Sequence, residues 1–147
     1  MKLYFDTSAL VKYYYQEQGT DYVTKLIQNE QNEIIISEIA IIEFISSLYK
    51  KFRTKELSES DLIIALNEFR LSLCDYTVEP FTSIVRENAE KIIAKFGKDY
   101  AIRTLDAMQL STYILIADNE SKFVCADSTL LKIVELTNQN FINLLVE

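Results

Sequence analysis

Short apolar segments alternate along the chain with longer segments that have helical periodicity. Five of the short segments are rich in Ile, Val, Phe or Tyr and are predicted to be strands: residues 2–5, 33–37, 76–79, 122–126 and 141–145. Strands that are separated by helices pair in parallel through right-handed crossovers. The sequence therefore predicts an α/β fold, in which helices cover both faces of one parallel sheet.

Residues that favour the first position of a helix precede several of the helical segments. Ser37, Ser58, Thr82 and Thr104 are each predicted to be an N-cap, because a side-chain oxygen there accepts a bond from a free backbone N–H. Helix ends are expected near Gly97 and Asn119. In the helix after Ser37, one apolar face is expected, formed by Ile41, Phe44, Ile45, Leu48, Tyr49 and Phe52.

The composition excludes several kinds of active site. The 147 residues include no His, which excludes Ser-His-Asp and Cys-His catalytic units and the usual zinc sites that contain His. The only glycines, Gly19 and Gly97, cannot form a P-loop or a G-x-G-x-x-G turn. Any catalysis must therefore depend on carboxylates, hydroxyls, amines or a bound metal. The length favours a single domain over residues 1–147.

The location of the protein is also constrained. Cys74 and Cys125 lie in apolar surroundings without C-x-x-C spacing, which is typical of reduced core residues in a cytosolic protein. Asp6 falls where a secretory signal would be apolar, and no uncharged apolar segment approaches the roughly 18 residues of a membrane helix. We therefore expect a soluble, cytoplasmic protein that does not interact with membranes.

Four acidic residues are predicted to meet at one edge of the sheet. Asp6 and Asp127 directly follow the first and fourth predicted strands, and each precedes hydroxyl residues and the start of a helix. Asp106 lies in the first turn of the helix that leads back to the fourth strand, and Glu43 lies in the second turn of the helix after the second strand. All four positions are near the carboxyl ends of the strands, where parallel sheets bind ligands.

Each acid also has a simpler explanation when it is considered alone. Asp6 and Asp127 are typical helix N-caps, and Asp106 suits the positive end of a helix dipole. Glu43 shares a polar helix face with Ser46, Ser47 and Lys50, which can be solvent-exposed or can form the wall of a cleft. Together, however, close carboxylates raise one another's pKa unless a cation neutralises them. Oxygen ligands without His or Cys favour Mg²⁺ or Mn²⁺.

The segments around these acids resemble the acidic motifs of PIN domains, particularly those of VapC-like toxin ribonucleases. The matching segments are YFDTSAL around Asp6, IAIIEF around Glu43, LDAMQL around Asp106 and FVCAD at Asp127. The resemblance covers nearly the whole chain. It implies a three-layer α/β/α fold with a five-stranded parallel sheet in the order 3-2-1-4-5, so that Asp6 and Asp127 would face each other.

The resemblance also implies an activity, which is the metal-dependent hydrolysis of RNA phosphodiesters by an endoribonuclease. Asp6, Glu43 and Asp106 would hold Mg²⁺ or Mn²⁺, and Asp127 would complete this catalytic site or help to place a second ion. Ser8 would support a ligand carboxylate or a water molecule. The implied partners are the RNA substrate, a cognate antitoxin of a type II toxin-antitoxin pair and a second copy of the chain.

Basic residues near these acids are expected to contact RNA although the net charge is −7. Lys50, Lys51 and Arg103 are close to Glu43 or Asp106 in the sequence, and the two lysines also suit a solvated helix end. Three residues near Asp106 depart from the small apolar residues that the family leads us to expect, namely Gln109, Ser111 and Thr112. The run of tyrosines at 13–15 is expected either to pack in the core or to form an interface.

Three other functions fit the pattern less completely. A haloacid dehalogenase-like phosphatase would use Asp6 as its nucleophile, but it needs a second Asp two residues later, where this chain has Ser8. A receiver-type phosphoacceptor domain needs paired acids after the first strand and a Lys at the end of a later strand, and neither is evident. A non-catalytic PIN-like binding module would retain the acids for the fold, and a metal would not stabilise it.

Overall fold

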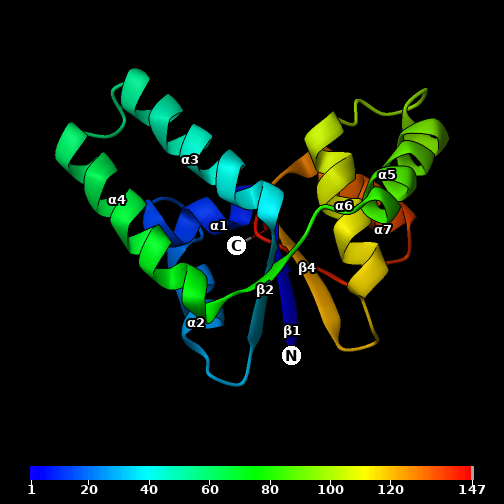
Figure 1. The fold of residues 1–147 in the computed structure, drawn as a ribbon, viewed down its shortest axis with the longest axis horizontal. Coiled ribbons are helices and arrows are strands. Elements are labelled where there is room, and N and C mark those ends of the chain that lie inside the picture. Colours follow the sequence, from blue (N-terminus) through cyan, green and yellow to red (C-terminus); the bar gives the residue numbers. More distant parts are fainter. Residues whose placement is uncertain (147) are drawn as a thin grey trace.

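The computed structural model describes residues 1–146 and contains a parallel sheet of five strands in the order β3-β2-β1-β4-β5 (Figure 1). This arrangement confirms the predicted fold class and strand order. The strands are β1 (Lys2–Phe5), β2 (Glu33–Ser37), β3 (Thr77–Glu79), β4 (Ser121–Cys125) and β5 (Phe141–Asn143). Because the order reverses between β1 and β4, these two central strands lie side by side and their carboxyl ends are adjacent.

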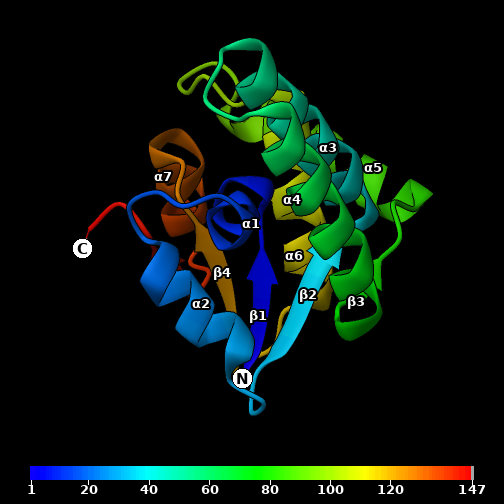
Figure 2. The same ribbon diagram turned by 90° about the vertical axis from the view of Figure 1, so that its left-hand side faces the viewer.

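Seven α-helices and one 3₁₀ turn connect the strands within residues 1–146. They are α1 (Thr7–Tyr14), α2 (Thr20–Gln28), α3 (Glu38–Arg53), α4 (Glu59–Ser72), the turn Leu73–Asp75, α5 (Ser83–Phe96), α6 (Thr104–Ile116) and α7 (Ser128–Leu136). Figure 2 shows the arrows of β1 and β2 pointing the same way. No helix in this part of the chain is both long enough and apolar enough to span a membrane.

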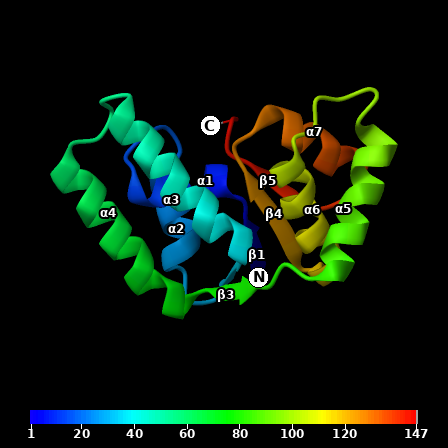
Figure 3. The ribbon, with the colours of Figure 1, turned by 45° about the horizontal axis from the view of Figure 1, so that its top comes forward.

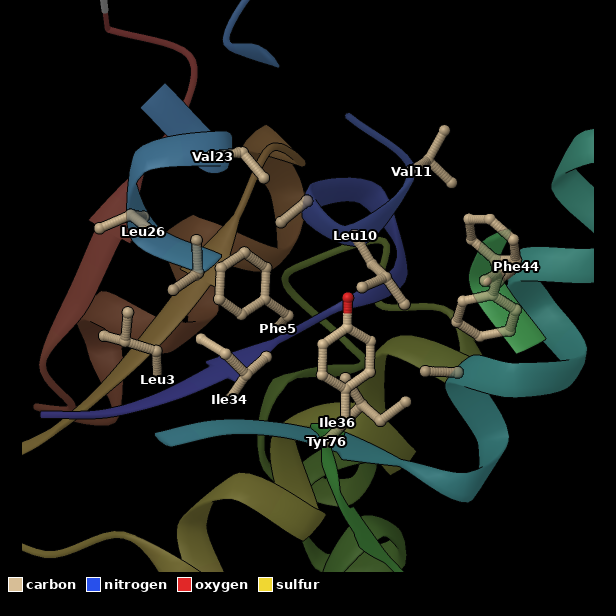
Figure 4. Close-up of a cluster of buried hydrophobic side chains, with 14 of the residues drawn as sticks. Leu3, Phe5, Leu10, Val11, Val23, Leu26, Ile34, Ile36, Phe44 and Tyr76 are labelled. Atoms are coloured by element: carbon tan, nitrogen blue, oxygen red, sulfur yellow. The ribbon is translucent and has the colours of Figure 1, made fainter. Parts of the chain in front are cut away.

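The sheet is buried on both faces, which explains why its central strands are largely apolar. On one face, Leu3 and Phe5 of β1 pack with Ile34 and Ile36 of β2 and with residues from α1 to α4 (Figure 4). On the other face, Tyr4 packs with Phe123 of β4 and with residues from α5, α6 and α7. Alternate side chains of one strand therefore serve two separate hydrophobic clusters, as expected of a three-layer fold.

Helices α3 and α4 form an arm that extends beyond the sheet (Figure 3). Phe44 and Leu48 are fully buried as predicted, whereas Tyr49 is 46% exposed and Phe52 is 39% exposed. The prediction that these last two residues belong to the buried face was wrong. Helical periodicity identifies the apolar side of α3, but the sheet covers only the first part of that helix.

Three of the four predicted N-caps are confirmed. Ser37, Ser58 and Thr82 each accept a hydrogen bond from a backbone N–H in the first turn of the next helix. Helix α6 differs, because Thr104 is its first residue and Arg103 occupies the cap position without a side-chain cap bond. This helix also ends before Asn119, since Ala117 already has extended backbone geometry. Gly97 follows α5 as predicted.

Three strands differ from their predicted limits because other groups take their backbone hydrogen bonds. β4 starts one residue earlier than predicted, at Ser121, and stops at Cys125, since the N–H of Ala126 donates to Ser8 Oγ at 2.9 Å. β3 starts at Thr77, because the N–H of Tyr76 donates to Leu73 in the 3₁₀ turn. β5 stops at Asn143, whose side-chain oxygen accepts from the N–H of Leu145 at 2.8 Å.

The cysteines and the tyrosine run have different degrees of burial. Both cysteines are free, but only Cys125 is buried. The prediction of a core position was wrong for Cys74, which lies in the solvent-facing 3₁₀ turn after α4.

The three tyrosines at 13–15 are partly buried and pack against the α1–α4 cluster, and the hydroxyl of Tyr14 is hydrogen-bonded to that of Tyr76. Core packing, one of the two predicted roles, therefore explains the tyrosine run.

Candidate active site

Two strand-to-helix turns bring Asp6 and Asp127 to the carboxyl edge of the sheet. Asp6 follows β1 and accepts a hydrogen bond from the N–H of Ala9 at 3.0 Å, and Asp127 follows β4 and accepts from the N–H of Leu130 at 2.8 Å. Both carboxylates are therefore helix N-caps, in agreement with the simpler explanation of their positions. Each cap bond uses only one carboxylate oxygen, so the second oxygen can make other interactions.

The four acids predicted to meet at this edge all line one cavity, which has a volume of about 520 Å³. They are Asp6, Glu43, Asp106 and Asp127, and each comes from a different element or turn. Ser8 and the predicted RNA contacts Lys50, Lys51 and Arg103 line the same cavity. The structure therefore brings together all eight residues that the sequence predicted for the site.

Asp6 is the most buried of the four acids, with only 4% of its surface exposed. Ser8 Oγ donates to its carboxylate at 2.8 Å, and Cys125 Sγ donates to it at 3.3 Å. Burial raises the pKa of Asp6 to about 6, and the negative charge of Asp106 contributes to the increase. These hydrogen bonds oppose the increase because they stabilise the charged carboxylate. The raised pKa indicates that a cation at this site would stabilise the ionised form.

Glu43 projects from α3 into the same cavity and has two hydrogen-bond donors from other helices. Gln109 Nε2 of α6 donates to Glu43 Oε1 at 2.8 Å, and Thr7 Oγ1 of α1 donates to the same oxygen at 3.2 Å. The helix face that carries Glu43 is therefore a wall of the cavity, which was one of the two predicted alternatives. The second oxygen, Oε2, makes no hydrogen bond within residues 1–146.

Arg103 links the two remaining acids. Its guanidinium donates to both oxygens of Asp106, at 2.8 and 3.3 Å, and to Asp127 Oδ2 at 3.0 Å. The hydrogen bonds to Asp106 raise the pKa of Arg103, so the side chain stays positively charged. Its side chain is 69% exposed, so it can leave these carboxylates without disturbing the core. In this arrangement Arg103 forms salt bridges with two of the four acids.

The lysines at the cavity have different surroundings. Lys51 Nζ lies 4.0 Å from Glu17 and 3.8 Å from Glu56. It also makes a cation–π contact with the ring of Tyr15. Lys50 is exposed and makes no salt bridge within residues 1–146. Lys50 is consequently better placed than Lys51 to contact a phosphate.

A hard divalent cation suits the donor atoms of this cavity, because they are carboxylate oxygens from four converging acids. The positions of these acids are not those of a closed metal site: in residues 1–146 no three His, Cys, Asp or Glu side chains are grouped closely enough to hold an ion. Arg103 explains part of this difference, since it occupies oxygens of Asp106 and Asp127 that would otherwise be free. The donor set therefore fits Mg²⁺ or Mn²⁺ chemically, provided that Arg103 moves.

The sequence did not identify three residues that contact the acids. Gln109 was singled out as a departure from the family pattern, but its contact with Glu43 was not predicted. Thr7 and Cys125 are each next to or near a site residue in the sequence, and nothing else about them indicates a role. The one signal in the sequence that could have been used is the polar Gln109 between the apolar Met108 and Leu110.

Comparison with known proteins agrees with this arrangement. The PIN domain family model matches residues 3–135. No curated protein sequence matches the chain significantly. Among solved structures, FitAcB from Neisseria gonorrhoeae has a TM-score of 0.72 at 12% identity, with 99% of each chain covered.

Two further solved structures have the same fold at low sequence identity. VapBC2 from Rickettsia felis, bound to a DNA fragment from its promoter, has a TM-score of 0.68 at 16% identity and covers 97% of this chain and 98% of its own. VapC20 from Mycobacterium tuberculosis, described as a toxin that cleaves the sarcin-ricin loop, has a TM-score of 0.67 at 14% identity and covers 88% and 93%. The family match, the strand order and the four acids at the edge of β1 and β4 agree: this chain belongs to the PIN domain family.

Proposed function

We propose that this protein is a metal-dependent endoribonuclease and the toxin of a type II toxin-antitoxin pair. The observation that supports this function most strongly is the convergence of four carboxylates on one cavity at the carboxyl edge of the sheet. No histidine is present to act as a general base, so metal-assisted hydrolysis is the chemistry that these side chains support best. Membership of the PIN domain family is consistent with it.

The proposed metal ligands are Asp6, Glu43 and Asp106, with Asp127 completing the site. Bound Mg²⁺ or Mn²⁺ would supply a nucleophilic water at neutral pH and would offset the negative charge of the phosphate. Ser8 orients the Asp6 carboxylate, to which it donates at 2.8 Å. Lys50 would contact a flanking RNA phosphate, and Arg103 would do so after it leaves the acids. These roles make each residue's contribution separately testable.

An antitoxin partner is supported by what the similar structures contain. Several are toxin-antitoxin complexes, among them VapBC from Salmonella typhimurium bound to DNA, and FitAB bound to a DNA fragment. We expect this chain to bind a cognate antitoxin and to form a homodimer. Light scattering of the purified chain, alone and after co-expression with the product of the adjacent gene, would test both expectations. A strict monomer in both samples would contradict them.

The activity is tested by incubating end-labelled RNAs with the purified protein in Mg²⁺ or Mn²⁺. We expect cleavage that leaves 5′-phosphate and 3′-hydroxyl ends. EDTA should abolish the cleavage, because it removes the ion that would supply the nucleophilic water. An Asp6→Asn variant purified in parallel should also be inactive, and it controls for a contaminating nuclease.

Binding of the metal provides a second and independent test. A ligand that binds only the folded state raises the melting temperature, so Mn²⁺ should stabilise the wild-type protein and should stabilise Asp6→Asn much less. Equal cleavage by wild type and Asp6→Asn, together with no thermal shift in either protein, would reject the proposed function. It would instead support the non-catalytic binding module.

A further inference from the structure

Gln109 is a buried polar residue that the proposed function has not yet used. It lies in the second turn of α6 and has 2% of its surface exposed. A polar side chain that is buried to this degree needs hydrogen-bond partners. The partners of Gln109 are side chains from three other elements: Tyr4 of β1, Thr7 of α1 and Glu43 of α3.

The directions of these hydrogen bonds are fixed by chemistry. An ionised carboxylate can only accept, so the amide nitrogen of Gln109 must face Glu43, which it contacts at 2.8 Å. The amide oxygen then faces Tyr4, whose hydroxyl donates to it at 2.6 Å. The phenolic hydroxyl of Tyr4 carries the proton that it donates in this bond. The amide of Gln109 is thereby held in one orientation.

The hydrogen-bonded chain connects the two faces of the sheet. Tyr4 is 1% exposed and stacks on Phe123 in the cluster beneath α5, α6 and α7. Glu43 belongs to α3, whose buried residues pack in the cluster on the opposite face. Gln109 is therefore the polar connection between Tyr4 in the second cluster and a carboxylate on the arm.

We infer that Gln109, oriented by Tyr4, is a positioning residue that holds the carboxylate of Glu43 toward the cavity. This inference rests on the proposed function, in which Glu43 is a metal ligand. Side chains that hydrogen-bond to metal ligands orient them and increase their affinity for the metal. Gln109 uses Oε1 of Glu43 and leaves Oε2 without a partner in residues 1–146, as a monodentate ligand requires.

A purely structural role is the alternative, and Ser111 provides a matched control for it. Ser111 is on the same helix, is fully buried, donates to the Val85 carbonyl at 2.6 Å and accepts from Asn88 Nδ2 at 3.0 Å. These partners belong to α5, and Ser111 does not line the cavity. Ser111→Ala thus removes two hydrogen bonds from α6 without removing a contact of Glu43.

The experiment is calorimetric titration of metal-free protein with Mn²⁺, with melting temperatures measured on the same samples. Gln109→Met keeps the length of the side chain but removes its donor and acceptor, and we expect it to weaken Mn²⁺ binding about tenfold. Tyr4→Phe should weaken binding in the same direction but less, because it acts through one further bond. Ser111→Ala should lower the melting temperature and leave Mn²⁺ affinity unchanged.

Each other outcome has a definite meaning. If wild type and Gln109→Met bind Mn²⁺ equally, the inference is rejected and the proposed function stands. If Ser111→Ala weakens binding as much as Gln109→Met, the effect is general packing and the inference is also rejected. If wild type binds no Mn²⁺, the proposed function fails and the inference with it. Should Gln109→Met not fold, Tyr4→Phe decides, and unchanged affinity in that variant rejects the inference.

Discussion

The carboxylate of Asp6 serves the fold and the candidate site at the same time. It caps α1 through the N–H of Ala9, and it accepts further bonds from Ser8 and Cys125. The cap stabilises the helix, whereas burial of the charge opposes folding, as the pKa of about 6 shows. A residue that is retained in spite of this cost is typical of a functional site, where stability is given up for activity.

Asp6→Asn should therefore stabilise the metal-free protein at neutral pH. Asn is as good an N-cap as Asp, and it carries no charge to bury. In the folded state the pKa of Asp6 rises from 3.8 to about 6, so protonated Asp6 stabilises the fold. This stabilisation is complete below pH 3.8 and is lost as the pH rises through about 6. At pH 7.5 we expect the free energy of unfolding to increase by on the order of 2 kcal/mol in the variant.

Urea denaturation in EDTA between pH 4.5 and pH 7.5 measures this difference. The two stability curves should separate as the pH rises, with Asp6→Asn the more stable protein at the upper limit. Parallel curves would mean that the carboxylate titrates alike in the folded and unfolded states. In that case burial does not change the pKa of Asp6.

Arg103 is predicted to compete with a metal ion for Asp106 and Asp127. Its positive charge lies within 3.3 Å of both carboxylates. Two unit charges about 4 Å apart interact by about 1 kcal/mol in water, which corresponds to about a fivefold change in affinity. Arg103→Gln should thus tighten Mn²⁺ binding about fivefold by calorimetry, while Arg103→Lys, which retains the charge, should have a smaller effect. Weaker binding by Arg103→Gln would show that Arg103 helps to assemble the site.

Individual site residues could be predicted from the sequence where their position follows from the path of the backbone. Asp6 and Asp127 end adjacent parallel strands, so their approach follows from strand order alone. The bond between Gln109 and Glu43 and the bridge by Arg103 could not be predicted, because each depends on side-chain conformation across residues far apart in the sequence. The same reason explains why Lys50 and Lys51, which were predicted alike, have different partners.

At the scale of elements, local signals identified most of the secondary structure. β1 and β2 have the predicted limits, and the caps at Ser37, Ser58 and Thr82 begin helices as expected. Errors occurred where a side chain or a turn took a backbone hydrogen bond, as Ser8 does at the end of β4. The exposed end of α3 was also missed, since periodicity gives the apolar side of a helix but not the length that the sheet covers.

The N-cap of α4 offers a test of whether the start of this helix is fully formed in the native state. Ser58 Oγ accepts from the N–H of Asp61 at 3.1 Å, in an exposed position away from the cavity. Ser58→Ala should lower the free energy of unfolding by about 1 kcal/mol, and Ser58→Asp should restore it. Equilibrium denaturation in urea, with an unchanged slope, would check this value. A loss of less than about 0.3 kcal/mol would mean that the start of α4 already frays in the native state.

For the whole molecule, the distribution of charge matters more than its sum. The net charge of −7 would repel a nucleic acid, yet four basic residues line the cavity beside six acidic ones. Lys12 Nζ lies 3.3 Å from Glu17. Lys51 is neutralised by Glu17 and Glu56, and Arg103 by two carboxylates. Of these cations, Lys50 is consequently the one that is available to an RNA phosphate without the loss of an existing ion pair in residues 1–146.

Lys50→Glu should therefore weaken RNA binding and reduce its dependence on salt. A lost phosphate contact lowers the slope of log K against log salt by about 0.7 for a single strand. Lys91→Glu on α5 makes the same change in net charge at an exposed residue that does not line the cavity. Fluorescence anisotropy with a labelled RNA, in an Asp6→Asn background that prevents cleavage, compares the two slopes. Equal slopes in both variants would show that only the total charge matters, and Lys50 would no longer be assigned as a contact. A reduced slope in Lys50→Glu alone would place the RNA along α3.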